Sequence, residues 1–190
     1  MSNPRTIVAV TGAAGGVGSI LAGGLGRDLR LLDVLPGPGC EMHDVRDLGA
    51  TEKAFAGVDA VIHLGAIPRE APFEEILDHN LRGTYNVFEA ARRQGVRRVV
   101  FASTNHVTGM YPRSERIGPD APLRPHTPSG PSKSIGEALA RPHPEKWGVS
   151  AVCIRSSTST QPRPPTTPTP PDLPPPATPP TQIREPPARP

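Results

Sequence analysis

The stretch Thr11-Gly12-Ala13-Ala14-Gly15-Gly16-Val17-Gly18 decides how the chain folds, because it joins a short apolar run to a segment of helical pattern. Gly12 permits a tight turn, Gly15 lets the backbone approach a phosphate, and Gly18 lets the helix pack closely on the strand. The helix that starts here offers free N–H groups and the positive end of its dipole to an anion. The stretch therefore predicts a binding turn for the pyrophosphate of a dinucleotide.

An acidic residue lies where such a site needs one. Asp33 follows Gly12 by 21 residues and ends the second apolar run. Its carboxylate would accept hydrogen bonds from the adenosine ribose hydroxyls and would repel a 2′-phosphate, so NAD is predicted over NADP. A flexible glycine-rich turn would explain the glycines but not the acid at this distance. We expect the cofactor to be held by Gly12, Ala14, Gly15, Gly16, Val17, Gly18 and Asp33.

Apolar runs of strand length alternate with helical segments along the chain. The runs show no polar alternation, which is typical of parallel strands covered on both faces. Strands are expected at residues 6–10, 29–34, 60–64, 98–102 and 150–154. Helices are expected at residues 16–27, 48–56, 74–94 and 132–147, the first of them short because it contains several glycines. The predicted fold class is α/β, a Rossmann-like doubly wound parallel sheet that is incomplete at its C-terminal end.

Composition limits the expected folded domain to residues 1–155. More than half of the 27 prolines follow Arg155, in a stretch of Pro, Thr and Ser with almost no large apolar residues. Such a stretch buries too little surface to offset its ordering entropy, so residues 156–190 are expected to be a disordered Pro/Thr-rich tail. The abrupt change in composition suggests a reading-frame shift, and a polyproline-like linker or partner-binding tail is the alternative.

Charge, hydropathy and cysteine usage exclude several classes of protein. The net charge is +3 and the Lys and Arg residues are scattered among acids, which argues against nucleic acid as a partner. The apolar runs are far shorter than the ~20 residues that span a bilayer, and the N-terminus lacks a signal-peptide pattern, so a cytoplasmic protein is expected. Cys40 and Cys153 show no metal-ligand spacing and are expected to be small buried residues.

Further candidate residues follow the second and third expected strands. Asp44 and Val45 would approach the adenine amino group of the cofactor, although Asp44 would also suit a helix N-terminus. The run Leu64-Gly65-Ala66 ends the third strand where the backbone must pass close to the cofactor, which favours the glycine. His63, just before that run, is expected to be a packed strand residue.

Taken together, residues 6–155 resemble the extended short-chain dehydrogenase/reductase family, and within it the NAD-dependent uronate dehydrogenases. The features that carry the resemblance are Gly12, Gly15, Gly18, Asp33, Asp44-Val45, Leu64-Gly65-Ala66, Asn80, Phe101-Ala102-Ser103-Thr104-Asn105-His106 and residues 128–133. The resemblance implies that Ser103, Asn105 and His106 contact a sugar acid, with a structural role in the loop as the alternative. It places Asn80 at the cofactor site, where fixing the helix and strand geometry is the favoured role.

The resemblance also implies a catalytic Tyr-x-x-x-Lys pair and a Ser or Thr at the end of the fourth expected strand. Lys133 and Thr104 match this pattern, but Ser129 stands at the tyrosine position and no tyrosine follows Tyr111. Loss of such an acid/base group typically costs on the order of 10² to 10⁴ in rate. The alternatives are that Thr104 only ends a strand and that Lys133 is a solvated helix residue, although it could still bind the nicotinamide ribose.

Three functions are compatible with these residues. The first is an NAD-dependent oxidoreductase that acts on a uronic acid or a related sugar and is impaired by the loss of the tyrosine. The second is an NAD-binding remnant without catalysis, and the third is a nucleotide-sugar epimerase or dehydratase. In each case the expected partner is a small molecule, and an open sheet edge beyond the last strand would permit a homo-oligomer.

Overall fold

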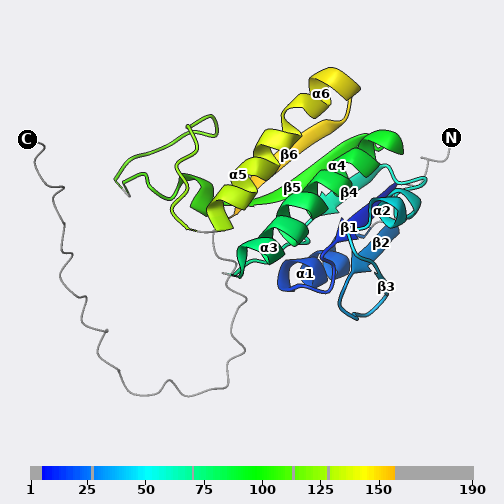
Figure 1. Cartoon of the computed structure of the whole chain (residues 1–190). Helices are drawn as coiled ribbons and strands as arrows, with labels where there is room; N and C mark the ends of the chain where they lie inside the picture. The colour runs from blue at the N-terminus through cyan, green and yellow to red at the C-terminus, as the bar shows by residue number, and fades with distance from the viewer. Residues whose placement is uncertain (1–5, 27, 70, 113, 128, 157–190) are drawn as a thin grey trace, which may run out of the picture. The chain divides into compact units, whose positions relative to one another are not determined.

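The computed structural model describes residues 6–26, 28–69, 71–112, 114–127 and 129–156. These residues form a six-stranded sheet in the order β3-β2-β1-β4-β5-β6 (Figure 1). The strands are β1 (Ile7–Thr11), β2 (Asp28–Asp33), β3 (Cys40–Met42), β4 (Ala60–His63), β5 (Arg98–Thr104) and β6 (Ser150–Ser156). Every pairing is parallel, and the order is that of the Rossmann fold. The fold class expected from the sequence is confirmed.

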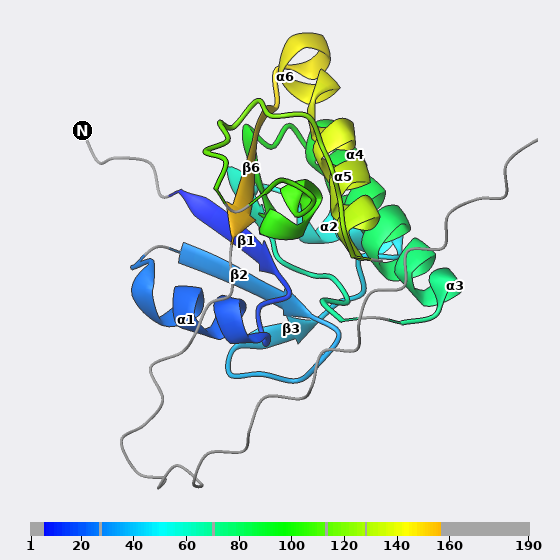
Figure 2. The ribbon, with the colours of Figure 1, turned by 90° about the vertical axis from the view of Figure 1, so that its left-hand side faces the viewer.

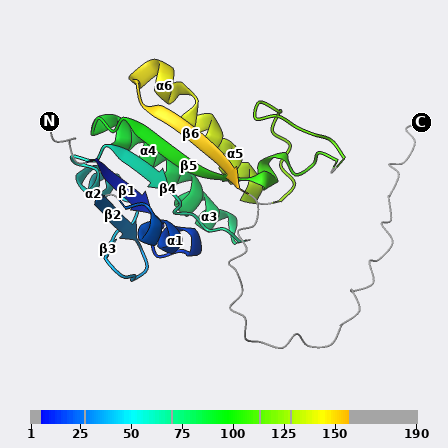
Figure 3. The same cartoon turned by 180° about the vertical axis from the view of Figure 1, so that it is seen from behind.

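The helices lie on two sides of this sheet. They are α1 (Gly16–Gly24), α2 (Leu48–Ala54), α3 (Phe73–Ile76), the π-helix η1 (Leu77–Arg82), α4 (Gly83–Arg93), the 3-10 helix η2 (Asn105–Thr108), α5 (Ser129–Ala140) and α6 (Pro142–Trp147). Figure 2 shows α1 on one side of the sheet and α2, α3, α4 and α5 on the other. Figure 3 shows β5 and β6 from the side of α1, where no helix of the described residues covers them.

We call the side of α2, α4 and α5 the packed face and the side of α1 the open face. Successive side chains of a strand point to opposite faces. On β5, Val99 and Phe101 lie on the packed face and are fully buried, whereas Val100 between them lies on the open face and is half-buried. On β6, the open-face side chains of Val152 and Ile154 are 45% and 52% exposed.

The hydrophobic core lies on the packed face. Its largest side chains, Phe55, Phe88 and Phe101, are almost completely buried, and the rings of Phe88 and Phe101 lie 6.3 Å apart. Helix α5 can approach β5 closely because Gly136 faces the ring of Phe101, and a Cβ atom at Gly136 would overlap that ring. This close approach brings the start of α5 to the carboxyl end of β5.

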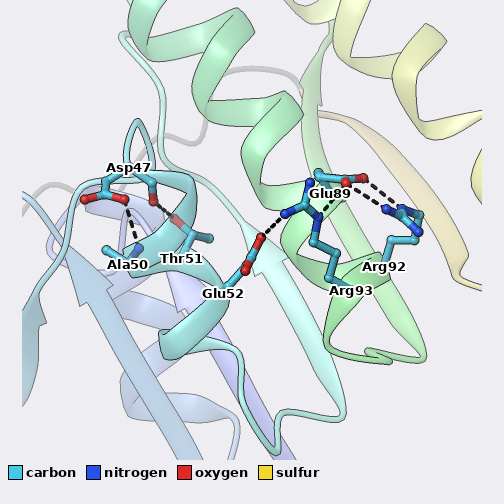
Figure 4. Close-up of polar contacts among 7 residues, drawn as sticks. All are labelled: Asp47, Ala50, Thr51, Glu52, Glu89, Arg92 and Arg93. Atoms are coloured by element: carbon cyan, nitrogen blue, oxygen red, sulfur yellow. Dashed lines mark hydrogen bonds and ion pairs between the residues drawn. The ribbon is translucent and has the colours of Figure 1, made fainter.

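Polar contacts fix α2 against α4 on the packed face (Figure 4). Asp47 caps the N-terminus of α2, because its carboxylate accepts the N–H of Ala50 at 2.9 Å. Glu52 of α2 forms an ion pair with Arg93 of α4 at 2.7 Å, and Arg93 also contacts Glu89 at 2.6 Å. The ion pair between Glu52 and Arg93 thus links α2 to α4 on the packed face.

Some element boundaries differ from those that the sequence predicts. The sequence does not predict β3, because this three-residue edge strand is half-buried or exposed and contains no apolar run. The helix expected at residues 74–94 is divided into α3, η1 and α4 by a π-helical turn. The helix expected at residues 132–147 begins at Ser129 and is interrupted before Pro142, which starts α6. Helix α1 ends at Gly24, as its glycines predict.

The segment after Thr104 begins with η2, continues as a long loop and then folds back on η2. The N–H of Arg124 donates to the carbonyl of Val107 at 2.8 Å, and the N–H of Met110 donates to the carbonyl of Arg124 at 3.0 Å. The rings of His106 and His126 lie 4.8 Å apart, which brings the far end of the loop back to η2.

Several expectations concern features beyond the folded core. Of the tail expected at residues 156–190, Ser156 instead ends β6 by pairing with β5, and residues 157–190 lie outside the described residues. Within the described residues, no helix has the length and apolar character needed to cross a membrane. The same part of the chain contains no cluster of three or more His, Cys, Asp or Glu residues suited to a metal ion. Cys40 and Cys153 are half-buried free thiols, and burial raises the pKa of Cys153 to about 11.

Candidate functional site

A cleft of about 1010 Å³ opens at the carboxyl ends of β1, β4 and β5 and extends over the open face. Ligands of open α/β sheets bind at this position. Among the expected site residues, the cleft is lined by Gly12, Gly15, Gly16, Val17, Gly18, Asp33, Asp44, Val45, Leu64, Gly65, Ala66, Asn80, Ser103, Thr104, His106 and Lys133. Ala14 does not line the cleft, and Asn105 lines a second cavity of about 610 Å³. The side chain of Ser129 lies outside the described residues.

The glycine turn after β1 is too tight for side chains. Gly12 has a φ of +74°, and a Cβ atom there would lie 2.6 Å from the backbone nitrogen of Gly65. A Cβ atom at Gly18 would overlap the carbonyl of Gly12 and the backbone of Ala13. The tight turn predicted for Gly12 is confirmed, and Gly18 lets α1 pack closely on the turn after β1 rather than on the strand itself. The approach of a phosphate to Gly15 stays a prediction.

The N-terminus of α1 faces the cleft without a side-chain cap. Gly15 occupies the N-cap position and has no side chain that could accept the first N–H groups of the helix. Gly16 and Val17 follow it and are exposed. Because the first N–H groups of a helix have no intrahelical partner, this end of α1 favours an anionic ligand.

The carboxylate of Asp33 is held at the rim of the glycine turn. One of its oxygens accepts the N–H of Ala14 at 2.8 Å, and the other accepts the N–H of Leu35 at 2.9 Å. The residue is only 8% exposed, yet it lines the cleft. Since each carboxylate oxygen can accept a second hydrogen bond, two backbone contacts fix Asp33 while leaving capacity for a ligand hydroxyl. Ala14 thus acts on this acid through its backbone.

The Asp44-Val45 segment forms the wall beside β3. Asp44 forms an ion pair with Arg46 at 2.6 Å, and the hydrogen bonds from Arg46 lower the pKa of Asp44. Asp47, three residues after Asp44, caps the N-terminus of α2. The helix-terminus role considered for Asp44 is therefore filled by Asp47. The side-chain amide of Asn86 donates to the carbonyl of Val45 at 3.0 Å, which ties this wall to α4.

His63 is a packed residue, as the sequence predicts. Its ring is fully buried, with Nδ1 at 2.7 Å from the hydroxyl of Thr11 and Nε2 at 3.1 Å from the hydroxyl of Thr84. Burial lowers the pKa of His63 to about 3, so the ring is neutral at physiological pH. It connects β1, β4 and α4 just before Leu64, which begins the run at the cleft.

Asn80 joins three segments around the cleft. Its side-chain oxygen accepts the N–H of Ile67 at 2.8 Å, and its amide donates to the carbonyl of Ile67 at 3.1 Å and to the hydroxyl of Ser132 at 3.2 Å. It lies in the π-helix η1, and such turns frequently occur at functional sites. The geometric role favoured for Asn80 is confirmed, and a contact with the cofactor stays a prediction.

The end of β5 brings the expected substrate residues to one corner of the cleft. The hydroxyl oxygen of Thr104 accepts the N–H of His106 at 3.2 Å and caps η2. Thr104 is half-buried and lines the cleft together with His106. Thr104 therefore ends a strand and also faces the site, so both roles considered for it are compatible with the geometry.

Lys133 enters the same corner from the second turn of α5. Its Nζ lies 4.8 Å from the centre of the Phe101 ring. Burial lowers the pKa of Lys133 to about 8. The lysine is thus not the solvated helix residue considered as the alternative, since it is half-buried and lines the cleft. Ser129 occupies the turn of α5 before it.

Sequence reasoning missed a buried ionic cluster behind this corner. The hydroxyl of Ser103 donates to Glu137 at 2.6 Å, and Arg155 donates to both carboxylate oxygens of Glu137 at 2.9 and 2.8 Å. Burial alone would raise the pKa of Glu137, but the hydrogen bonds from Arg155 and Ser103 lower it below its ordinary value. The only sequence signal is the position of Glu137 one helical turn after Lys133.

This geometry agrees with a family match. The model of the NAD dependent epimerase/dehydratase family matches residues 8–172. The chain belongs to the NAD-dependent epimerase/dehydratase family. The resemblance to uronate dehydrogenases expected from the sequence is also confirmed, because a uronate dehydrogenase of Agrobacterium fabrum is 44% identical over 160 residues, 80% of this chain and 60% of that protein.

Other members of the epimerase/dehydratase family are similar in sequence and in structure. The UDP-glucose 4-epimerase of Streptomyces lividans is 33% identical over 164 residues, 76% of this chain and 50% of that protein. A solved mutant of the Agrobacterium tumefaciens uronate dehydrogenase, complexed with NAD, has a TM-score of 0.73 at 44% identity, covering 77% of this chain and 59% of that one. The chain spans about 60% of the length of the curated uronate dehydrogenases that it matches.

Proposed function

We propose that the cleft binds NAD and that the chain is the nucleotide-binding part of an oxidoreductase of the uronate dehydrogenase type. The observation that carries this proposal is the open glycine turn beside Asp33, whose carboxylate is fixed by the N–H groups of Ala14 and Leu35. The uncapped start of α1 would hold the diphosphate, and Asp33 would accept the ribose hydroxyls. The NAD complex of a relative that is 44% identical supports the same assignment.

The other end of the cleft would receive the nicotinamide and the sugar acid. When bound, NAD would supply a hydride acceptor. The hydroxyl of Thr104 would hydrogen-bond a substrate hydroxyl, and Lys133 would donate to the nicotinamide ribose. Ser103, Asn105 and His106 are the proposed substrate contacts, although the hydroxyl of Ser103 is engaged by Glu137.

Catalysis by this site would be impaired because a phenol is absent from α5. Ser129 stands where the family resemblance implies tyrosine, and a serine hydroxyl is too short and too weakly acidic to replace it. Tyr85 lies exposed on α4, and the hydroxyl of Tyr111 donates to the carbonyl of Pro122 in the long loop. We expect turnover to be lower by on the order of 10² to 10⁴ than with a phenol in place.

Calorimetric titration tests the cofactor site. The chain should bind NAD more tightly than NADP, and Asp33→Asn should reduce this preference because the carboxylate that repels the 2′-phosphate is gone. Asp120→Asn, an exposed acid in the long loop, is the matched control and should change neither affinity. A dissociation constant for NAD weaker than about 1 mM would contradict the proposal.

The formation of NADH from NAD with galacturonate or glucuronate tests the reaction. Slow turnover that increases in Ser129→Tyr is the expected result. Rapid turnover by the unchanged chain would contradict the impairment, and NAD binding without turnover in either form would favour an NAD-binding remnant.

The relation to a UDP-glucose 4-epimerase supports a second candidate reaction. Interconversion of UDP-glucose and UDP-galactose without net NADH would favour it.

A further inference from the structure

The amine of Lys133 lies in a confined position at the cleft. Its Nζ is 4.8 Å from the centre of the Phe101 ring, and Gly136 on the same helix allows that approach. Lys133 is half-buried and lines the cleft, so a small molecule that enters there can reach it. Burial without loss of access distinguishes this lysine from Lys53 in α2 and Lys146 in α6, which are exposed.

No acid balances the charge of this amine. Among the described residues, no carboxylate lies within ion-pair distance of Lys133. Glu137, one turn later on α5, is occupied by Ser103 and Arg155. His63 has a pKa of about 3, so its ring is neutral near pH 7 and contributes no charge. Burial therefore lowers the pKa of Lys133 to about 8, even though the ring of Phe101 favours the ammonium form.

The sequence also lacks the phenol that would give this lysine an acidic partner. The two tyrosines are Tyr85 and Tyr111, and neither lies on α5. An accessible amine that is partly unprotonated near neutral pH is the form in which lysine attacks carbonyl groups.

We propose that Lys133 forms an imine with small aldehydes that enter the cleft. The nitrogen lone pair forms a C–N bond to the carbonyl carbon while the carbonyl oxygen takes up a proton. The resulting carbinolamine then loses this oxygen as water, and the amine has given up two hydrogens to form C=N. The reaction needs no oxidant or reductant. Its ligand class is small aldehydes, including the open-chain aldehyde of a uronic acid, and it requires no bound NAD.

Competition among the lysines of the full chain tests this proposal. The sequence contains three, Lys53, Lys133 and Lys146. The chain is incubated with glycolaldehyde and sodium cyanoborohydride, which reduces imines to stable secondary amines, and the labelled peptides are quantified by mass spectrometry. Near neutral pH, Lys133 should be labelled on the order of tenfold faster than the other two, because burial lowers the pKa of its amine to about 8. Equal rates at the three lysines would overturn the proposal.

The pH dependence provides a second readout on the same molecule. The labelling rate of Lys133 should rise with pH and level off above about 8. Lys133→Met should remove the fast labelling and Lys146→Met, the matched control, should retain it. Because the decisive comparison uses the unchanged chain, a variant that fails to fold does not affect it.

Adding NAD separates this proposal from the proposed function. Fast labelling of Lys133 that NAD does not slow would support the imine and count against the cofactor site. NAD binding measured by calorimetry together with slow labelling of Lys133 in the absence of NAD would overturn the imine proposal and leave the cofactor site intact.

Discussion

The two faces of the sheet are built from the same strands but differ in what they do. On the packed face, Val61, Val99 and Phe101 are fully buried under α2, α4 and α5. On the open face, Val100 is half-buried and Ile154 is 52% exposed, and both line the cleft. Neighbouring residues of one strand therefore supply stability on one side and ligand-binding surface on the other, because side chains alternate along a strand.

The difference shows which part of the chain tolerates change. Apolar burial on the packed face is the main source of stability, while apolar surface on the open face is available to a ligand. Substitutions on the packed face should therefore lower the free energy of unfolding, whereas substitutions around the cleft should chiefly affect binding.

The largest expected effect on the free energy of unfolding tests the difference between the packed face and the open face. Phe101→Ala should lower the free energy of unfolding by about 3–5 kcal/mol, because it leaves a cavity beneath α5. Ile154→Ala on the open face should cost less than about 1 kcal/mol, since half of that side chain is already exposed. Urea denaturation of both variants measures the difference, and equal losses would refute the assignment of the core to one face.

The buried ion pair behind the cleft should have the next largest effect. Glu137→Ala should cost about 3 kcal/mol, because it leaves the guanidinium of Arg155 partly buried without its carboxylate partner. Asp78→Ala breaks the exposed pair with Arg82 and should cost less than about 1 kcal/mol. Denaturant midpoints test this prediction, which fails if the two variants are equally stable.

A substitution in the glycine turn should lower the free energy of unfolding less than the two preceding changes do, but it should affect NAD binding more. Gly12→Ala should cost about 1–3 kcal/mol, because its positive φ and the close backbone of Gly65 both oppose a side chain. Gly57→Ala is the matched control: its φ is also positive, but no atom lies within 4 Å of the added Cβ. Only Gly12→Ala should abolish NAD binding in calorimetry, and full binding by that variant would contradict the site.

The last prediction concerns the pH dependence of the free energy of unfolding. Because burial lowers the pKa of His63 from 6.5 to about 3, the unfolded chain binds one more proton than the folded chain between these values. The stability is thus present above pH 6.5 and falls with decreasing pH by about 1.4 kcal/mol per unit. In His63→Gln the slope between pH 6.5 and about 5 should be shallower by this amount, and an unchanged slope would contradict it. His43 and His143, whose pKa values burial also lowers, contribute to the slope that remains.

Local patterns predicted the parts of the site that depend on neighbours in the chain. Gly12 and Gly18 were predictable because a turn between strand and helix has fixed steric needs, and Asp33 was predictable from its distance along the chain. The strand β3 was not, since a short edge strand needs no apolar run. The π-helical turn at Asn80 was also missed, because apolar spacing does not distinguish it from an α-helix.

The sequence by itself determined the parallel sheet, the glycine turn after its first strand and the acid that ends the second, because each follows from steric or hydrophobic patterns within a short segment. Only the tertiary structure decided that the amine of Lys133, which has no carboxylate partner among the described residues, lies over the ring of Phe101. It also decided that Glu137 accepts hydrogen bonds from Ser103 and Arg155. These contacts join residues 18 to 34 positions apart. They exist because α5 packs on β5 and β6, and no pattern within a single segment specifies that packing.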